Sequence, residues 1–265
     1  MVLCCAAQLE AVRRTFLSRI TPILMANTPT NEPIPEGAEV LEDCPLSEAD
    51  DKYTEAHYFL ERMMAEYHNP QKFRWNLNAF LQALRNVTFL LQSQLAHRDG
   101  FDSWYAARQE EMGRDALLRR FVEGRNIVVK QRNLLMKSTA RIGVFMGGRL
   151  KLGLVMDVPA HLPSSYIISE MAPRLGFVPE DHAFIDEQYG VQRDWIAEEL
   201  GEDNVLTLCD TAWVKISSVL RAAHRWIGLD MATPDLHGHD PAKCDTLTET
   251  DLDPSLPKKW GWTEE

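Results

Sequence analysis

The sequence predicts a mainly α fold, a helical bundle with an inserted β-hairpin and an irregular C-terminal tail. Apolar side chains recur every three or four residues over most of the chain, which is the period of an amphipathic helix. Near residues 140–156 the period changes to two, which is the period of a half-buried strand. We therefore expect one bundle domain over residues 1–229 that contains the hairpin, followed by a polar tail over residues 230–265.

The N-terminal part of the chain contains two helical patterns separated by a polar stretch. Residues 7–26 predict a first helix, and residues 54–67 predict a second. Residues 27–51 between them are rich in Pro, Glu and Asp, which predicts an exposed connection. The apolar positions of the two helices are Leu9, Val12, Phe16, Ile20, Ile23, Tyr58, Phe59, Met63 and Tyr67.

The clearest helical pattern begins at Asn69 and Pro70 and runs to about His97. An Asn side chain can cap the first turn, and Pro suits a position whose N–H would have no intrahelical partner. Asp99 and Gly100 then stop the helix. Its apolar stripe, which we expect to face the core, consists of Phe73, Leu77, Phe80, Leu81, Leu84, Val87, Leu91 and Leu95.

Two more helices are predicted before the hairpin, a short one over residues 103–112 and a longer one that Asp115 caps. Arg125 falls in phase with the apolar stripe of the longer helix. Because an unpaired buried charge is very costly, its guanidinium must pair with a carboxylate or line a cleft. The apolar positions of that helix are Leu117, Leu118, Phe121, Val122, Val128, Val129 and Leu135.

The C-terminal half begins with the hairpin, in which Gly147 and Gly148 separate two alternating apolar runs. Residues 179–200 predict a helix that Gly190 interrupts, and residues 203–227 predict a stronger helix that ends at Gly228. The apolar positions of these two regions are Ile142, Val144, Met146, Leu150, Leu152, Leu154, Val205, Cys209, Trp213, Ile216, Leu220, Ala223 and Ile227.

Composition excludes several classes of protein. The formal net charge of −11 opposes non-specific binding to a polyanion, so any nucleic-acid role requires a local basic patch. No apolar run is long enough to span a bilayer, and no secretory signal pattern is present, so we expect no membrane association. Five scattered cysteines predict no disulfide framework, which favours a reducing cytoplasm.

Residues 124–131 resemble the motif of the HEPN superfamily of helical-bundle proteins. In that family an Arg, often followed by Asn, precedes a His by four to six residues near a helix end. Arg125 and Asn126 match the first two positions, whereas Lys130 stands where the His is expected. The resemblance covers roughly residues 70–135 and 203–227. It implies a homodimer with two motifs facing a shared cleft, and many members are metal-independent ribonucleases of toxin or defence systems.

The departure at Lys130 falls on the catalytic position. RNA cleavage by the ribose 2′-hydroxyl needs a group that exchanges a proton near neutral pH, which imidazole does well. An amine with an ordinary pKa of about 10.4 is a poor base, but it can stabilise phosphoryl charge. The resemblance thus assigns the catalytic positions to Arg125, Asn126 and Lys130, and the RNA-binding positions to Arg85, Arg125 and Lys130. The alternative for Arg125 is an ordinary ion pair within the bundle.

No sequence motif points to a metal or a cofactor, and we expect neither. His237, His239, Asp240 and Cys244 are suitable zinc ligands, but they lie in the polar tail without a second spaced cluster. The glycines near the hairpin fit neither a dinucleotide fingerprint nor a P-loop, and no nucleophile elbow is present.

The sequence leaves two functions open. The first is a HEPN-like protein that acts by binding RNA or a partner protein, with ribonuclease activity weakened by Lys130. The second is a helical enzyme of another class, with a pocket between the bundle and the hairpin. Convergent carboxylates or histidines in the largest cleft would favour the second.

Overall fold

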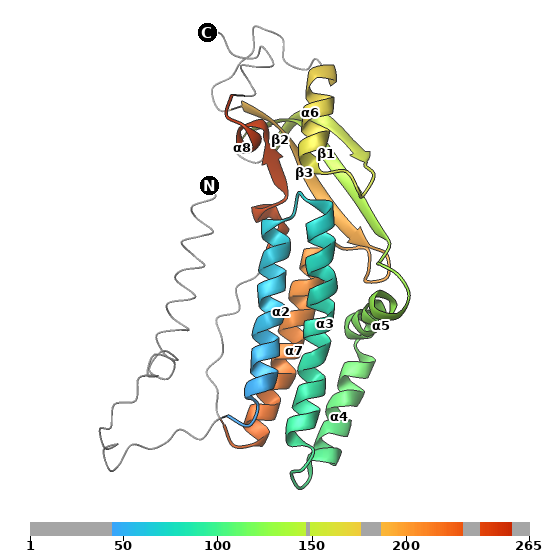
Figure 1. Cartoon of the computed structure of the whole chain (residues 1–265), viewed down its shortest axis with the longest axis vertical. Helices are drawn as coiled ribbons and strands as arrows, with labels where there is room; N and C mark the ends of the chain where they lie inside the picture. Colours follow the sequence, from blue (N-terminus) through green and yellow to red (C-terminus); the bar gives the residue numbers. More distant parts are fainter. Residues whose placement is uncertain (1–43, 147–148, 176–186, 230–238, 256–265) are drawn as a thin grey trace, which may run out of the picture. The chain divides into compact units, whose positions relative to one another are not determined.

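A computed structural model describes residues 44–146, 149–175, 187–229 and 239–255. Helices form a bundle, and a small antiparallel sheet lies at one end of it (Figure 1). The described elements are α2 (Ser47–Ala65), α3 (Pro70–Leu95), α4 (Phe101–Arg114), α5 (Ala116–Lys130), β1 (Met136–Met146), β2 (Arg149–Asp157), α6 (Ser164–Leu175), β3 (Glu187–Ala197), α7 (Val205–Trp226), the 3₁₀ turn η1 (Pro241–Lys243), β4 (Thr246–Thr248) and α8 (Glu249–Leu252). The prediction of a mainly α protein is confirmed, with a sheet larger than a hairpin.

The core of the bundle lies between α2, α3 and α7, which run side by side (Figure 1). Every residue of the apolar stripe predicted for α3 is buried, which confirms its inward face. The Asn69 side chain accepts a hydrogen bond from the Lys72 N–H, so the predicted cap is also confirmed. Tyr53 of α2 stacks on Trp213 of α7, with ring centroids 4.7 Å apart.

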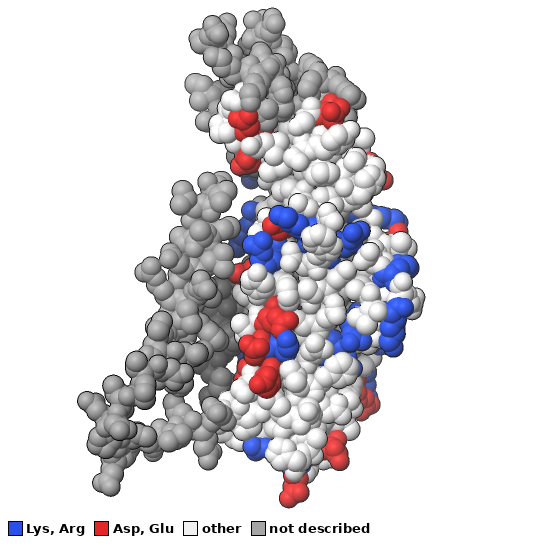
Figure 2. Space-filling model, in the orientation of Figure 1, with Lys and Arg blue, Asp and Glu red and all other residues white. Residues whose placement is uncertain are grey.

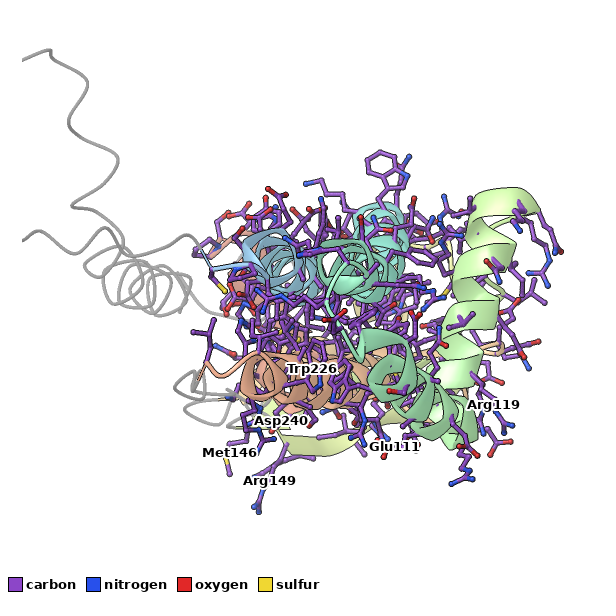
Figure 3. The ribbon with its side chains drawn as sticks, turned by 90° about the horizontal axis from the view of Figure 1, so that it is seen from below. Glu111, Arg119, Met146, Arg149, Trp226 and Asp240 are labelled. Atoms are coloured by element: carbon purple, nitrogen blue, oxygen red, sulfur yellow. The ribbon has the colours of Figure 1, made fainter. Side chains whose placement is uncertain are left out.

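Helix α5 begins as predicted but ends earlier. Asp115 Oδ1 accepts the N–H groups of Leu117 and Leu118, at 2.9 and 3.1 Å. The helix ends at Lys130, so Leu135 lies outside it and is exposed. Val129 is exposed as well, because α5 lies across the long helices and only part of its length is covered (Figure 3).

The sheet has the strand order β2-β1-β3-β4 and is antiparallel throughout. The β1–β2 hairpin is as predicted, but β1 also pairs with β3 from Met136 to Met146. The predicted helix over residues 179–200 is therefore wrong for residues 187–197, which form a strand. Tertiary pairing with β1 overrides the helix-favouring residues of this segment, while residues 179–186 lie outside the described part.

Two side chains tie the sheet to the bundle. Tyr67, which follows α2, donates its hydroxyl to the backbone oxygen of Arg193 at 2.9 Å. The Trp195 indole N–H donates back to the Tyr67 carbonyl oxygen, also at 2.9 Å. Both contacts are buried, so they position the sheet firmly against the helices.

The described part of the C-terminal segment is ordered structure rather than an irregular tail. Residues 239–255 contain η1, β4 and α8, and β4 extends the sheet by pairing with β3. The composition of residues 246–248 alone suggests a loop, but backbone hydrogen bonds to β3 make them a strand. The start of α2 at Ser47 likewise shortens the predicted connection over residues 27–51. The predicted helix over residues 7–26 lies outside the described residues. None of the described helices is long and apolar enough to cross a membrane.

Candidate functional site

The outer face of α3 carries a row of polar and aromatic side chains that we call the α3 stripe. Its members follow a three- and four-residue spacing, which places them on one side of the helix. They are Trp75, Asn78, Gln82, Arg85 and Phe89. The two aromatic side chains are unusually open to solvent, with Trp75 56% and Phe89 44% exposed. Both side chains are therefore accessible to a ligand that lies along the outer face of α3.

Helix α5 and the residues after it lie beside the α3 stripe. The Asn78 amide donates to Asn133 Oδ1 at 3.1 Å, just past the end of α5. Further along both helices, Arg125 lies close enough to Arg85 for its positive charge to lower the pKa of the Arg85 guanidinium. We call the α3 stripe together with Arg125, Asn126 and Lys130 the α3–α5 face. Of the four sequence-predicted site residues, the structure places Arg125 close to Arg85 and in contact with Asn126, while Lys130 is exposed at the C-terminal end of α5.

Arg85 is the best-positioned charge on the α3–α5 face. Its Nη1 donates to Thr88 Oγ1 at 2.7 Å, and its Cζ lies 4.2 Å from the ring centroid of Phe89. Burial lowers the pKa of Arg85; the negative charge of an ionised Tyr105 would oppose this change, and the positive charge of Arg125 adds to it. A guanidinium keeps its proton under such conditions, so Arg85 presents a fixed positive charge.

No described hydrogen bond joins Lys130 to Arg125 or Asn126. Arg125 Nη1 donates to Asn126 Oδ1 at 3.3 Å, a contact between sequence neighbours. The Nε of Arg125 is buried and has no hydrogen-bond partner among the described residues. Lys130 is exposed at the end of α5. The expected ion pair of Arg125 with a bundle carboxylate is not formed within the described chain.

A cavity of about 330 Å³ lies between α3, α4 and α5, next to Arg85. Its walls are mainly apolar, and Tyr105, Thr88 and Glu123 supply polar groups. No histidine and no second carboxylate lines it, and none of its lining residues comes from the sheet. The cavity therefore does not match the predicted enzyme pocket between bundle and hairpin.

Charged side chains are unevenly distributed on the visible surface. Figure 2 shows Lys and Arg over the sheet-proximal ends of α2 and α3 and over α5, while Asp and Glu gather over α2. Figure 3 shows Arg119 of α5 extending outward. The chain thus carries a local basic patch despite its formal net charge of −11.

The candidate zinc ligands of the C-terminal segment separate in the structure. His239 Nδ1 contacts Asp210 Oδ1 at 2.6 Å, whereas Asp240 caps η1 and the Cys244 thiol lies 3.5 Å from the Pro241 carbonyl oxygen. His237 lies outside the described residues. Sequence reasoning missed that His239 approaches two side chains of α2, because about 180 residues separate these positions.

The comparisons with known proteins point to a bacteriophage family. The family "Bacteriophage lambda protein ea47" matches residues 38–253. "Protein ea47" of Escherichia phage lambda is 36% identical over 85 residues, which is 32% of this chain and 21% of that protein. The aligned part thus spans about a fifth of the relative's length. No solved structure matches the chain.

These findings overturn the predicted membership of the HEPN superfamily, because the matching family and relative are both Ea47. The resemblance rested on the Arg125-Asn126 dipeptide, and a match of two residues is weak evidence for a family. The family match covers most of the chain, so the protein belongs to the bacteriophage lambda Ea47 family.

Proposed function

We propose that the protein binds single-stranded nucleic acid on the α3–α5 face and that RNA is its principal ligand. The observation that carries the proposal is Arg85 stacked on the exposed Phe89, with Arg125 alongside and no carboxylate paired to either within the described chain. Proteins that bind single strands combine positive charge along the backbone path with aromatic side chains on which bases stack. The α3–α5 face contains both.

The spacing of the aromatic side chains suits an extended strand. Trp75 and Phe89 are 14 positions apart on α3, which corresponds to about 21 Å along a helix axis. Between them, the exposed Gln82 can accept a hydrogen bond from a base edge with its Oε1, while its Nε2 donates to the backbone oxygen of Asn78. A single strand of a few nucleotides can therefore run along α3, with its phosphates toward Arg125 and Lys130 of α5.

The proposed activity is binding without cleavage. The named residues of the α3–α5 face include no histidine and no carboxylate. Arg85, Arg125 and Lys130 supply charge that attracts phosphates, which is a binding role.

Fluorescence anisotropy with labelled single-stranded RNA, single-stranded DNA and duplex RNA tests the proposal. Trp75→Ala should weaken binding of single strands by about 10-fold or more, because it removes one stacking platform. Tyr58→Ala removes an equally exposed aromatic side chain from α2 and should leave binding unchanged. Equal effects of the two substitutions, or tighter binding of the duplex, would contradict the proposed site.

We further propose that the chain associates with a second copy of itself through β2. β2 is an edge strand whose outer side pairs with no described strand. Leu152, Leu154 and Met156 are exposed and lie opposite buried residues of β1. They therefore continue the apolar face of the sheet beyond the part that is buried within the fold. Figure 3 shows Met146 and Arg149, at the ends of β1 and β2, extending away from the helices.

Antiparallel pairing of two β2 strands about Gly153 would place Leu152 opposite the Leu154 of the other copy. Such pairing would give hydrogen-bond partners to the backbone groups on the outer side of β2, and it would also bury the apolar side chains. Light scattering at about 50 μM should show a dimer, and Leu154→Lys should shift it to monomer. Tyr58→Lys, on an exposed position of α2, is the matched control. A monomeric wild type at this concentration would count against the interface.

A further inference from the structure

Three metal-ligating side chains from two distant parts of the chain meet beside α2. His57 and Glu61 are one turn apart on that helix, and His239 precedes η1. One potential ligand atom from each lies within 4.8 Å of the others, and His57 Nε2 is 3.9 Å from Glu61 Oε1. Two imidazoles and a carboxylate form a donor set that zinc and other divalent transition metals bind.

Asp210 of α7 holds His239 in the orientation that metal binding requires. Its Oδ1 lies 2.6 Å from His239 Nδ1 and also accepts the His239 backbone N–H at 3.3 Å. An imidazole that donates Nδ1–H to a carboxylate keeps its lone pair on Nε2 and becomes more basic there. Metal-bound histidines commonly have such a carboxylate partner, and this contact is independent of the three-ligand cluster.

The surroundings make the cluster a bounded site that is open on one side. Trp213 forms one wall, with its ring centroid 4.8 Å from that of His57 and 6.0 Å from that of His239. Side-chain exposure rises from 5% at His239 to 20% at His57 and 35% at Glu61. The Glu61 side therefore faces solvent, which leaves room for a fourth ligand such as water.

A second cluster, Cys44, Asp50 and His224, has suitable donor types but another arrangement. His224 Nε2 contacts Asp50 Oδ2 at 3.1 Å, and its Nδ1 lies 3.0 Å from the Leu220 carbonyl oxygen. Both ring nitrogens thus face oxygen acceptors, which suits a protonated imidazole in an ion pair. Burial also raises the pKa of the Cys44 thiol and disfavours the thiolate that a metal needs.

We propose that His57, Glu61 and His239 bind one Zn²⁺ ion and that Asp210 is the positioning residue for His239. Zinc ligands lie about 2.0–2.2 Å from the ion, so the three atoms must approach to about 3.5 Å. The partly exposed Glu61 and His57 can make this movement by small side-chain rotations. The bound ion joins α2 to residues 239–255 and keeps one position for water or another ligand.

Isothermal titration of chelator-treated, full-length protein with ZnCl₂ tests this assignment. Wild type should bind one Zn²⁺ per chain and gain several degrees in melting temperature. His239→Gln and Glu61→Gln should each weaken zinc binding on the order of 10²-fold, and Asp210→Asn by about 10–100-fold. The matched controls His97→Gln and Glu55→Gln remove the same side-chain types elsewhere and should change nothing. Circular dichroism of the metal-free proteins shows whether each variant folds. If one of the ligand variants does not fold, His57→Gln is used in its place to remove a ligand.

The visible spectrum of the Co²⁺-loaded protein identifies the ligands directly. Nitrogen and oxygen ligation gives weak d–d bands, which Asp210→Asn should shift because it removes the carboxylate that orients His239. Thiolate ligation adds an intense near-ultraviolet band. If wild type shows this band and Cys44→Ser lacks it, the metal is bound by the cluster of Cys44, Asp50 and His224. That result, the absence of zinc binding by wild type, or unaltered affinity in His239→Gln would overturn the proposal.

Discussion

The guanidinium of Arg193 lies on the ring of Trp195, with its Cζ 3.9 Å from the ring centroid, where the sheet meets the bundle. Arg193 is fully buried and donates to the Ser138 hydroxyl and to the backbone oxygens of Pro159 and Leu162. Burial lowers the pKa of Arg193 to about 10, so the side chain stays protonated at neutral pH. A buried cation thus holds β1, β3 and the loop before α6 together through neutral oxygens.

Replacing Arg193 should therefore destabilise the fold. Arg193→Ala leaves buried oxygens without donors and creates a cavity, which should lower the free energy of unfolding by about 2–5 kcal/mol. Arg141→Ala in the same sheet removes a partly exposed ion pair with Asp194 and should cost less than about 1 kcal/mol. Urea denaturation followed by circular dichroism measures both. Similar losses in the two variants would show that Arg193 has no special structural role.

Leu84 tests the packing of the bundle. It is 4% exposed on the inner face of α3, so Leu84→Ala should lower the free energy of unfolding by about 2–5 kcal/mol through the cavity it leaves. Gln82→Ala, on the exposed face of the same helix, should change it by less than about 0.5 kcal/mol. Chemical denaturation gives both values. An unchanged midpoint and m-value for Leu84→Ala would mean that the inward face of α3 is wrongly assigned.

The ion pair between His224 and Asp50 predicts a specific dependence of stability on pH. Burial would lower the pKa of His224, but the hydrogen bond and the charge of Asp50 outweigh burial and raise it above 6.5. The folded state thus favours the protonated imidazole. The stabilisation is complete below about pH 6.5 and is lost as pH rises through the raised pKa.

His68 acts in the opposite direction, because burial lowers its pKa to about 4, so the pH dependence of the wild type alone is not diagnostic. The diagnostic measurement is thermal unfolding of wild type and of Asp50→Asn at several pH values. The difference in melting temperature should be largest near pH 6 and should shrink toward about pH 9. A difference that does not change with pH would show that His224 is not protonated in the fold.

Helix positions were predictable from the sequence where one apolar face repeats over several turns. The stripe of α3 and the caps at Asn69 and Asp115 are local signals, and the structure confirms them. β3 was missed although Tyr189, Val191 and Trp195 are buried at period two. Arg193 occupies an inward position in that alternation, and a charged residue there hides the pattern of a buried strand.

The candidate sites depend on contacts that sequence spacing does not show. The α3 stripe is visible as a spacing, but its proximity to Arg125 comes from the way α5 crosses the bundle. His57 and His239 meet only because the C-terminal segment returns to α2. Periodicity describes one element at a time, and neither pairing is a property of one element.

The salt dependence of RNA binding tests the proposed α3–α5 face most directly. Each Arg that contacts a phosphate of a single strand contributes about 0.7 to the slope of log K against log salt concentration. Arg85→Gln and Arg125→Gln should each reduce that slope by about this amount, whereas Arg62→Gln, paired with Glu66 on α2, should not. Binding with an unchanged slope in both variants, or no binding by wild type at low salt, would contradict the account.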